Sequence, residues 1–104
     1  MNYKKIKNEI INYFKEQPEI VTIYLFGSTV SSSNKKSKDI DIALLIKNKF
    51  KENIDSLSIM TDLSSILNKD VDIIIMNDAS PLLSYEIRKK GKIIFSISNS
   101  NAHV

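Results

Sequence analysis

Two aspartates inside an apolar segment limit the folds open to this chain more than any other feature of its sequence. The segment Asp39 to Ile46 reads DIDIALLI. Its strict alternation at the start predicts a β-strand with Asp39, Asp41 and Ala43 on one face and the isoleucines between them on the other. An unpaired carboxylate in a buried or half-buried strand costs several kcal/mol. The fold must therefore offset these two charges.

A cation between the two carboxylates would offset both charges. Side chains two residues apart on a strand point the same way, with Cα atoms roughly 6.5 to 7 Å apart, so Asp39 and Asp41 can converge on one ion. The chain has no cysteine and one histidine, His103, so a metal must be held chiefly by oxygen atoms, which favours hard cations. Magnesium accepts a few carboxylates and keeps its other positions for water and phosphate oxygens. His103 lies in a polar tail, and we assign it no role.

A third aspartate repeats the anomaly. Asp72 interrupts the β-prone run VDIIIM, residues 71–76, although aspartate is disfavoured in strands. If that strand lies beside the first, Asp72 can share the metal and take a proton from an attacking hydroxyl. The alternative is that all three aspartates are surface charges, and the Asp-x-Asp pattern taken alone favours it.

The positions of Gly27 and Ser28 in the sequence favour the metal-site interpretation of the aspartates over the surface-charge one. They directly follow the hydrophobic segment EIVTIYLF, residues 19–26, and precede the aspartate pair. Glycine lets the backbone approach an anion closely, and Ser28 offers a hydroxyl and a backbone N–H. Most Gly-Ser pairs are only strand-ending turns. It is the order of the motifs that indicates a triphosphate site.

The remaining periodicities predict alternating helices and strands. Helices are expected over Tyr3 to Phe14, around Ile59 to Leu67 with an end near Asn68, and from Pro81 to Gly91; strands are expected over 19–26, 39–46, 71–76 and 92–97. Ser80 should cap the last helix and Gly91 should end it in a left-handed conformation. Leu82, Leu83 and Ile87 of that helix are expected to face the core, and Tyr85, Glu86 and Arg88 to have structural roles only.

This order predicts a single α/β (α+β) domain over residues 1–97, with a mixed sheet of three to four strands and helices packed against it. Residues 98–104 should form a flexible polar tail. The chain has 104 residues, of which 42% are hydrophobic and 26% charged, as expected for a globular protein. It shows neither an apolar run of about 18 residues nor a secretory leader, so we expect it in the cytoplasm and not in a membrane.

The net charge of +3 comes almost wholly from lysine, because Arg88 is the only arginine. Base readout and bidentate phosphate contacts favour arginine, whereas scattered lysines give a nonspecific attraction to anions. Direct nucleic-acid binding is therefore not expected. The lysines Lys35, Lys36 and Lys38 precede the aspartate pair, but such a run is usually a solvated loop, and we assign it no role.

Together these motifs resemble the DNA polymerase β-like nucleotidyltransferase superfamily, whose signature is a strand, Gly-Ser, a short helix and Asp-x-Asp on the next strand. The matching segments are LFGS at 25–28, KDIDIALL at 38–45 and VDIII at 71–75. With MNDASPLLSYEIRKKGKIIF at 76–95, the chain is similar to the minimal nucleotidyltransferase (MNT) branch, whose members act as antitoxins of HEPN-domain toxins. The resemblance covers nearly everything except the tail.

The resemblance implies specific roles for the motif residues. Gly27 and Ser28 would hold the nucleotide phosphates, Asp39 and Asp41 would bind two Mg²⁺ ions, and Asp72 would complete the metal and base site. The implied reaction is transfer of AMP from ATP to a tyrosine hydroxyl of the partner toxin, with which the chain would form a hetero-oligomer.

One departure from the family pattern leaves an alternative open. Where this branch commonly has an arginine after Gly-Ser, the chain reads TVSSS at 29–33. A catalytically weak or inactive domain that neutralises the toxin by binding alone is therefore the second hypothesis. Modification of a small molecule such as an aminoglycoside is a third, but those relatives usually carry another domain for the acceptor, and this chain has no room for one.

Overall fold

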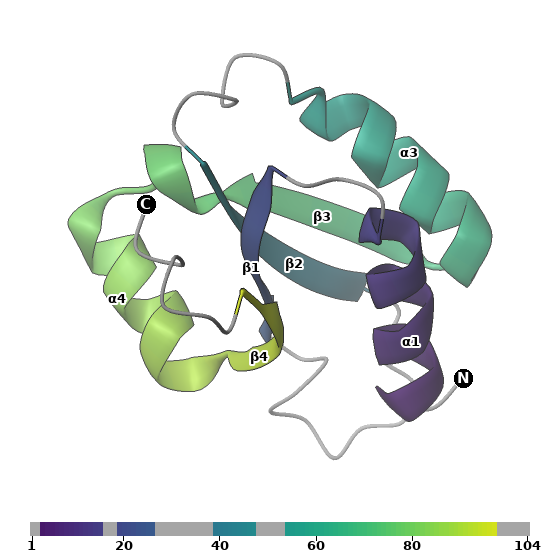
Figure 1. Ribbon diagram of the computed structural model, residues 1–104, viewed down its shortest axis with the longest axis horizontal. Helices are drawn as coiled ribbons and strands as arrows, with labels where there is room; N and C mark the ends of the chain where they lie inside the picture. The colour runs from purple at the N-terminus through teal and green to yellow at the C-terminus, as the bar shows by residue number, and fades with distance from the viewer. Residues whose placement is uncertain (1–2, 16–18, 27–38, 48–53, 98–104) are drawn as a thin grey trace.

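The computed structural model describes residues 3–15, 19–26, 39–47 and 54–97 (Figure 1). In chain order the elements are α1 (Tyr3–Phe14), β1 (Ile20–Phe26), β2 (Asp39–Ile46), α3 (Ser56–Leu67), β3 (Asp70–Ile75), the short 3-10 helix η2 (Met76–Asp78), α4 (Pro81–Lys90) and β4 (Lys92–Ser96). The predicted α/β class and the order of helices and strands are confirmed. Gly27, Ser28, the lysines before Asp39 and the predicted tail lie outside the described residues.

The four strands form one mixed sheet in the order β3-β2-β1-β4. β1 pairs antiparallel with both β2 and β4, whereas β2 and β3 run parallel and are joined through α3. A parallel pair needs a crossover of this kind, because a tight turn can join only antiparallel strands. The two central strands β1 and β2 are covered on both faces, which explains why their sequences are almost continuously hydrophobic.

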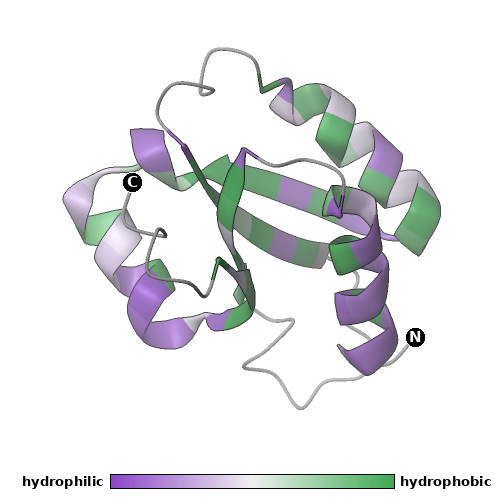
Figure 2. Ribbon diagram, in the orientation of Figure 1, coloured by the Kyte–Doolittle hydropathy of each residue, from purple (hydrophilic) through white to green (hydrophobic). Residues whose placement is uncertain are grey.

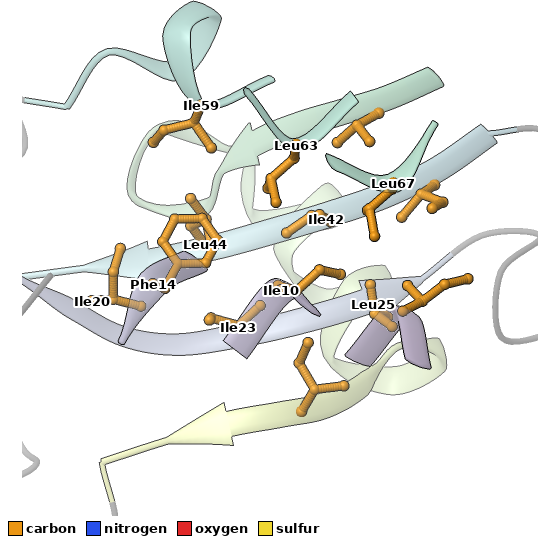
Figure 3. Packing of buried hydrophobic residues seen from close by; sticks show 14 of the residues in the cluster. Ile10, Phe14, Ile20, Ile23, Leu25, Ile42, Leu44, Ile59, Leu63 and Leu67 are labelled. Carbon is orange, nitrogen blue, oxygen red and sulfur yellow. The ribbon is translucent and has the colours of Figure 1, made fainter. Parts of the chain in front are cut away.

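Helices cover the sheet on both sides and divide its apolar side chains into two clusters. α1 and α3 cover one face through Ile10, Phe14, Ile59, Leu63 and Leu67, which meet the inward residues of β1 and β2 (Figure 3). The opposite face has a smaller cluster, in which Met76 and Ile87 meet Tyr24 and Ala43. The alternation predicted for β2 is confirmed: Ile40, Ile42 and Leu44 belong to the first cluster and Ala43 to the second.

Short polar contacts fix the helix ends. The Asp55 side chain accepts a hydrogen bond from the Ser58 N–H at the start of α3, and Ser80 accepts one from the Leu83 N–H at the start of α4, as predicted. α3 ends at Asn68, which adopts a left-handed conformation with φ of 54°. Asparagine tolerates this region better than most residues because its short side chain can hydrogen-bond locally.

The left-handed ending predicted for Gly91 is wrong. Gly91 has φ of −80° and ψ of 167°, an extended backbone open to any residue. Glycine is required there for space, since a Cβ atom would lie 2.7 Å from the Ile87 carbonyl oxygen, 3.1 Å from that of Leu25 and 3.3 Å from the Cβ of Phe26. The close approach brings the end of α4 against the end of β1.

The predicted inner face of α4 is also only partly right. Ile87 is buried, but Leu82 is 72% exposed and Leu83 is 38% exposed. A helix of ten residues that crosses the sheet once buries a narrow stripe, so apolar residues beside that stripe remain at the surface. Glu86 pairs with Lys90 and Lys89 lies over the Tyr85 ring, which agrees with structural roles for this face. Within the described residues, no helix combines the length and apolarity needed to cross a membrane.

The contact between α1 and α3 makes stability sensitive to alkaline pH. The Tyr13 hydroxyl donates a 2.7 Å hydrogen bond to Asp62 Oδ2. Burial, then this hydrogen bond and the charge of Asp62, raise the pKa of Tyr13 from 10.0 to about 12. Because the folded pKa is the higher one, the contribution to stability is complete below pH 10 and is lost as pH rises toward about 12.

Urea unfolding across this range should show a smaller loss of stability in Tyr13→Phe than in the parent chain. Equal losses of stability in the two chains would contradict this contribution of Tyr13.

Candidate active site

Asp41 and Asp72 are brought together by the parallel pairing of β2 and β3. The register places Asp41 directly opposite Asp72. Both residues alternate with side chains of the larger apolar cluster, so both project from the face that α4 covers. Neighbouring strands lie about 4.7 to 4.9 Å apart, so the two carboxylates stand within reach of a common ion. Asp41 is half-buried and Asp72 is exposed at the sheet edge.

A second pair of aspartates, Asp39 and Asp70, precedes the first pair by two residues on each strand, in the same register. The backbone of Asp39, the first residue of β2, is opposite Asp70, the first residue of β3. Asp70 was not predicted as a site residue. Its signal was in the sequence: KDVDIII at 69–75 repeats the pattern of KDIDIAL at 38–44. Hydrophilic bands interrupt the hydrophobic colour of β2 and β3 in Figure 2.

The Asn77 side chain continues this register beyond the end of β3. Its Oδ1 accepts a hydrogen bond of 3.0 Å from the Ile46 N–H, and its Nδ2 donates one of 2.7 Å to the Ile46 carbonyl. Residues 46 and 77 are 31 apart in sequence, the same offset as Asp41 and Asp72. Asn77 therefore acts as an extra rung of the β2–β3 ladder and helps to hold the alignment of the carboxylates.

The end of β1 lies beside the acidic pair. Phe26, the last residue of β1, is opposite Asp41 on β2. In the sequence Gly27 and Ser28 directly follow Phe26, and both lie outside the described residues. The end of α4 reaches the same point, because Gly91 is packed against Phe26. The structure thus places the neighbours of the two motifs at one end of the sheet.

The donor atoms present suit a magnesium ion. Asp41 and Asp72 offer carboxylate oxygens from adjacent strands, and Mg²⁺ is commonly held by one or two carboxylates with water and phosphate oxygens in its remaining positions. Among the described side chains, no group of three carboxylates or imidazoles converges on a point. The third predicted ligand is Asp39, of which the structure describes only the backbone. Among the described side chains, the fit to Mg²⁺ therefore rests on Asp41 and Asp72.

Comparison with known proteins identifies the family of the chain. Residues 8–100 match the family described as Polymerase beta, Nucleotidyltransferase. The chain is 33% identical over 87 residues to Protein adenylyltransferase MntA of Shewanella oneidensis, across 83% of this chain and 62% of the relative. The chain thus spans less than two thirds of the length of that curated relative.

Solved structures of toxin–antitoxin complexes have the same fold. One is a crystal structure of a toxin–antitoxin with AMP-PNP, with a TM-score of 0.75 and 29% identity over 88% of this chain and 74% of the other. Another is described as a tri-AMPylated Shewanella oneidensis HEPN toxin in complex with its MNT antitoxin, with a TM-score of 0.70 and 28% identity over 90% of this chain and 72% of the other.

Proposed function

Because this chain belongs to the polymerase β nucleotidyltransferase family, we propose that it transfers AMP from ATP to a tyrosine hydroxyl of a HEPN-type toxin and so acts as that toxin's antitoxin. The alignment of Asp41 with Asp72 carries the proposal, because carboxylates on one face of adjacent strands are donors of the kind that Mg²⁺ takes together with phosphate oxygens. The similarity to MntA and to complexes of MNT antitoxins with HEPN toxins supports the choice of acceptor.

In the proposed reaction the tyrosine oxygen attacks the α-phosphorus of ATP. The bond from this oxygen to phosphorus forms as the bond from phosphorus to the bridging oxygen breaks, and pyrophosphate leaves. Asp72, at the exposed edge of the sheet, accepts the proton from the tyrosine hydroxyl. Backbone N–H groups at Gly27 and the hydroxyl of Ser28 orient the phosphates.

Asp39, Asp41 and Asp72 would hold Mg²⁺, two ions by family resemblance. When bound, this cation supplies positive charge that offsets the charge on the attacking and leaving oxygens. The cytoplasm, where ATP and Mg²⁺ are both abundant, is the compartment we propose for the protein.

The second candidate is a domain that neutralises the toxin by binding alone. The observation in its favour is the sequence TVSSS at 29–33, which lacks the arginine commonly found in this branch. A domain of this kind would keep the fold and the partner while losing the transfer reaction.

Incubation with α-³²P-labelled ATP and Mg²⁺, with and without a HEPN-type protein as the partner, distinguishes the two candidates. We expect label on a tyrosine of the partner, identified by mass spectrometry, and none when EDTA is added. A partner that binds the chain but remains unlabelled would replace the enzyme proposal by the binding one. If the partner neither binds nor becomes labelled, the antitoxin assignment is wrong.

A further inference from the structure

A hollow of about 520 Å³ lies between α3 and the outer edge of β3. It is lined by Met60, Thr61 and Ser64 of the helix and by Asp70, Val71 and Asp72 of the strand. Asp72 is both a lining residue and a member of the acidic pair, so the hollow adjoins the candidate active site at the edge of β3. An acceptor must reach Asp72 from the solvent, and Asp72 is exposed at the outer edge of β3.

The backbone of β3 is oriented to receive another strand. Among the strands that the structure describes, β3 ends the sheet order, with β2 on one side only. The Val71 N–H donates to Ser64 Oγ at 3.3 Å, so it points away from β2. In a parallel ladder the backbone groups of alternate residues point the same way, so those of Ile73 also face outward. The Val71 N–H is already taken by Ser64, so the outward backbone groups of Ile73 are the ones that can hydrogen-bond to an extended segment of another chain.

We propose that an extended segment of the protein partner, carrying the acceptor hydroxyl, binds along the edge of β3 as an added strand. The inference rests on the proposed function and specifies how its acceptor binds. In an added strand, the residue opposite Asp72 has its side chain on the face from which Asp41 and Asp72 project. It stands one strand spacing, about 4.8 Å, from Asp72. Residues on either side of it point toward α3 and enter the hollow.

The charge of the hollow selects the kind of segment. Among the described residues, its lining includes Asp70 and Asp72 but neither lysine nor arginine, while Met60 and Val71 supply apolar surface. A lysine or arginine two residues from the acceptor lies on the same face as the acceptor and can stand opposite Asp70, whereas an acidic residue there is repelled. The affinity should therefore fall as salt is added, because exposed charges are screened.

Hydrogen exchange measured by mass spectrometry tests the docking edge without relying on catalysis. Adding the HEPN-type partner should slow exchange of the β3 amides, residues 70–75, while β4 at the opposite edge is an internal control. Protection of β4 with none at β3 would overturn the proposal. Protection of β3 in the chain alone at raised concentration would assign the edge to a second copy of this chain and would overturn it as well.

A matched pair of variants on α3 tests the hollow. Thr61→Arg places a large cation in the hollow, whereas Ser65→Arg adds the same charge at an exposed position that does not line it. Thr61→Arg should weaken partner binding by about tenfold and leave ATP binding unchanged. Equal affinities of the two variants for the partner would contradict the proposal.

The two proposals can fail separately. If β3 is protected and Thr61→Arg weakens binding but no AMP is transferred, the docking edge stands and the proposed reaction is wrong. If AMP is transferred and Thr61→Arg labels the partner as fast as the parent chain does, the reaction stands and the docking edge is wrong.

Discussion

Replacing Asp41 or Asp72 by asparagine is expected to reduce AMP transfer by about 10³-fold or more, the loss typical when a group that stabilises transition-state charge is removed. Asparagine nearly matches aspartate in shape, so the β2–β3 register should persist. The amide cannot accept the hydroxyl proton, and it is a weaker ligand for a hard cation. Initial rates of labelling of the HEPN-type partner measure the effect.

Thermal unfolding provides a readout separate from transfer. A ligand that binds only the folded state raises the melting temperature as its concentration increases. Mg²⁺ should therefore stabilise the parent chain and fail to stabilise Asp41→Asn or Asp72→Asn. Asp62→Asn is the matched control, because it removes one carboxylate from the contact between α1 and α3, which cover the face of the sheet opposite to the pair. Normal transfer in either site variant would show that the pair is not the metal site.

Gly91→Ala is expected to lower the free energy of unfolding by about 1 to 3 kcal/mol, the usual cost of forcing an extra group into packed structure. Two of the three atoms that the new Cβ would meet belong to the backbone, at 2.7 Å and 3.1 Å, so no rotation of a side chain relieves the clash. The loss is a large share of the roughly 5 to 15 kcal/mol that stabilises a typical domain. Gly91→Val should cost more.

Urea unfolding followed by circular dichroism measures this loss. Lys89→Ala, an exposed change in the same helical turn, is the control and should have a much smaller effect. An unchanged unfolding midpoint in Gly91→Ala would mean that the end of α4 can move away from β1 at no cost. The explanation given for this glycine would then be wrong.

The elements were predicted well because their patterns are local. Alternation gave the bounds of β2, Asp39–Ile46, and the three- and four-residue steps gave those of α1, Tyr3–Phe14. Ser80 and Pro81 marked the start of α4 through capping chemistry that involves only adjacent residues. The bounds of β2 and α1 and the start of α4 can therefore be predicted from adjacent residues of the sequence.

The features that were missed depend on tertiary contacts. The need for glycine at position 91 arises from its approach to Leu25 and Phe26, which are distant in sequence. The exposure of Leu82 depends on how α4 crosses the sheet. The sequence indicated that Asp41 and Asp72 both lie on strands, but their register depends on the crossover through α3 and on the Asn77 contact with Ile46. The sequence repeat already marks Asp70 as a candidate, and the register then places it opposite Asp39.

The offset of 31 residues between paired positions of β2 and β3 also sets when the site can appear during synthesis. A nascent chain that has left the ribosome as far as β2 already contains Gly27, Ser28, Asp39 and Asp41, but Asp72 and the strand that bears it are still to come. A domain generally folds as a unit once its chain has emerged. The acidic pair therefore cannot form before β3 has been made, and a chain released before β3 is complete would have the nucleotide motif without a partner for Asp41.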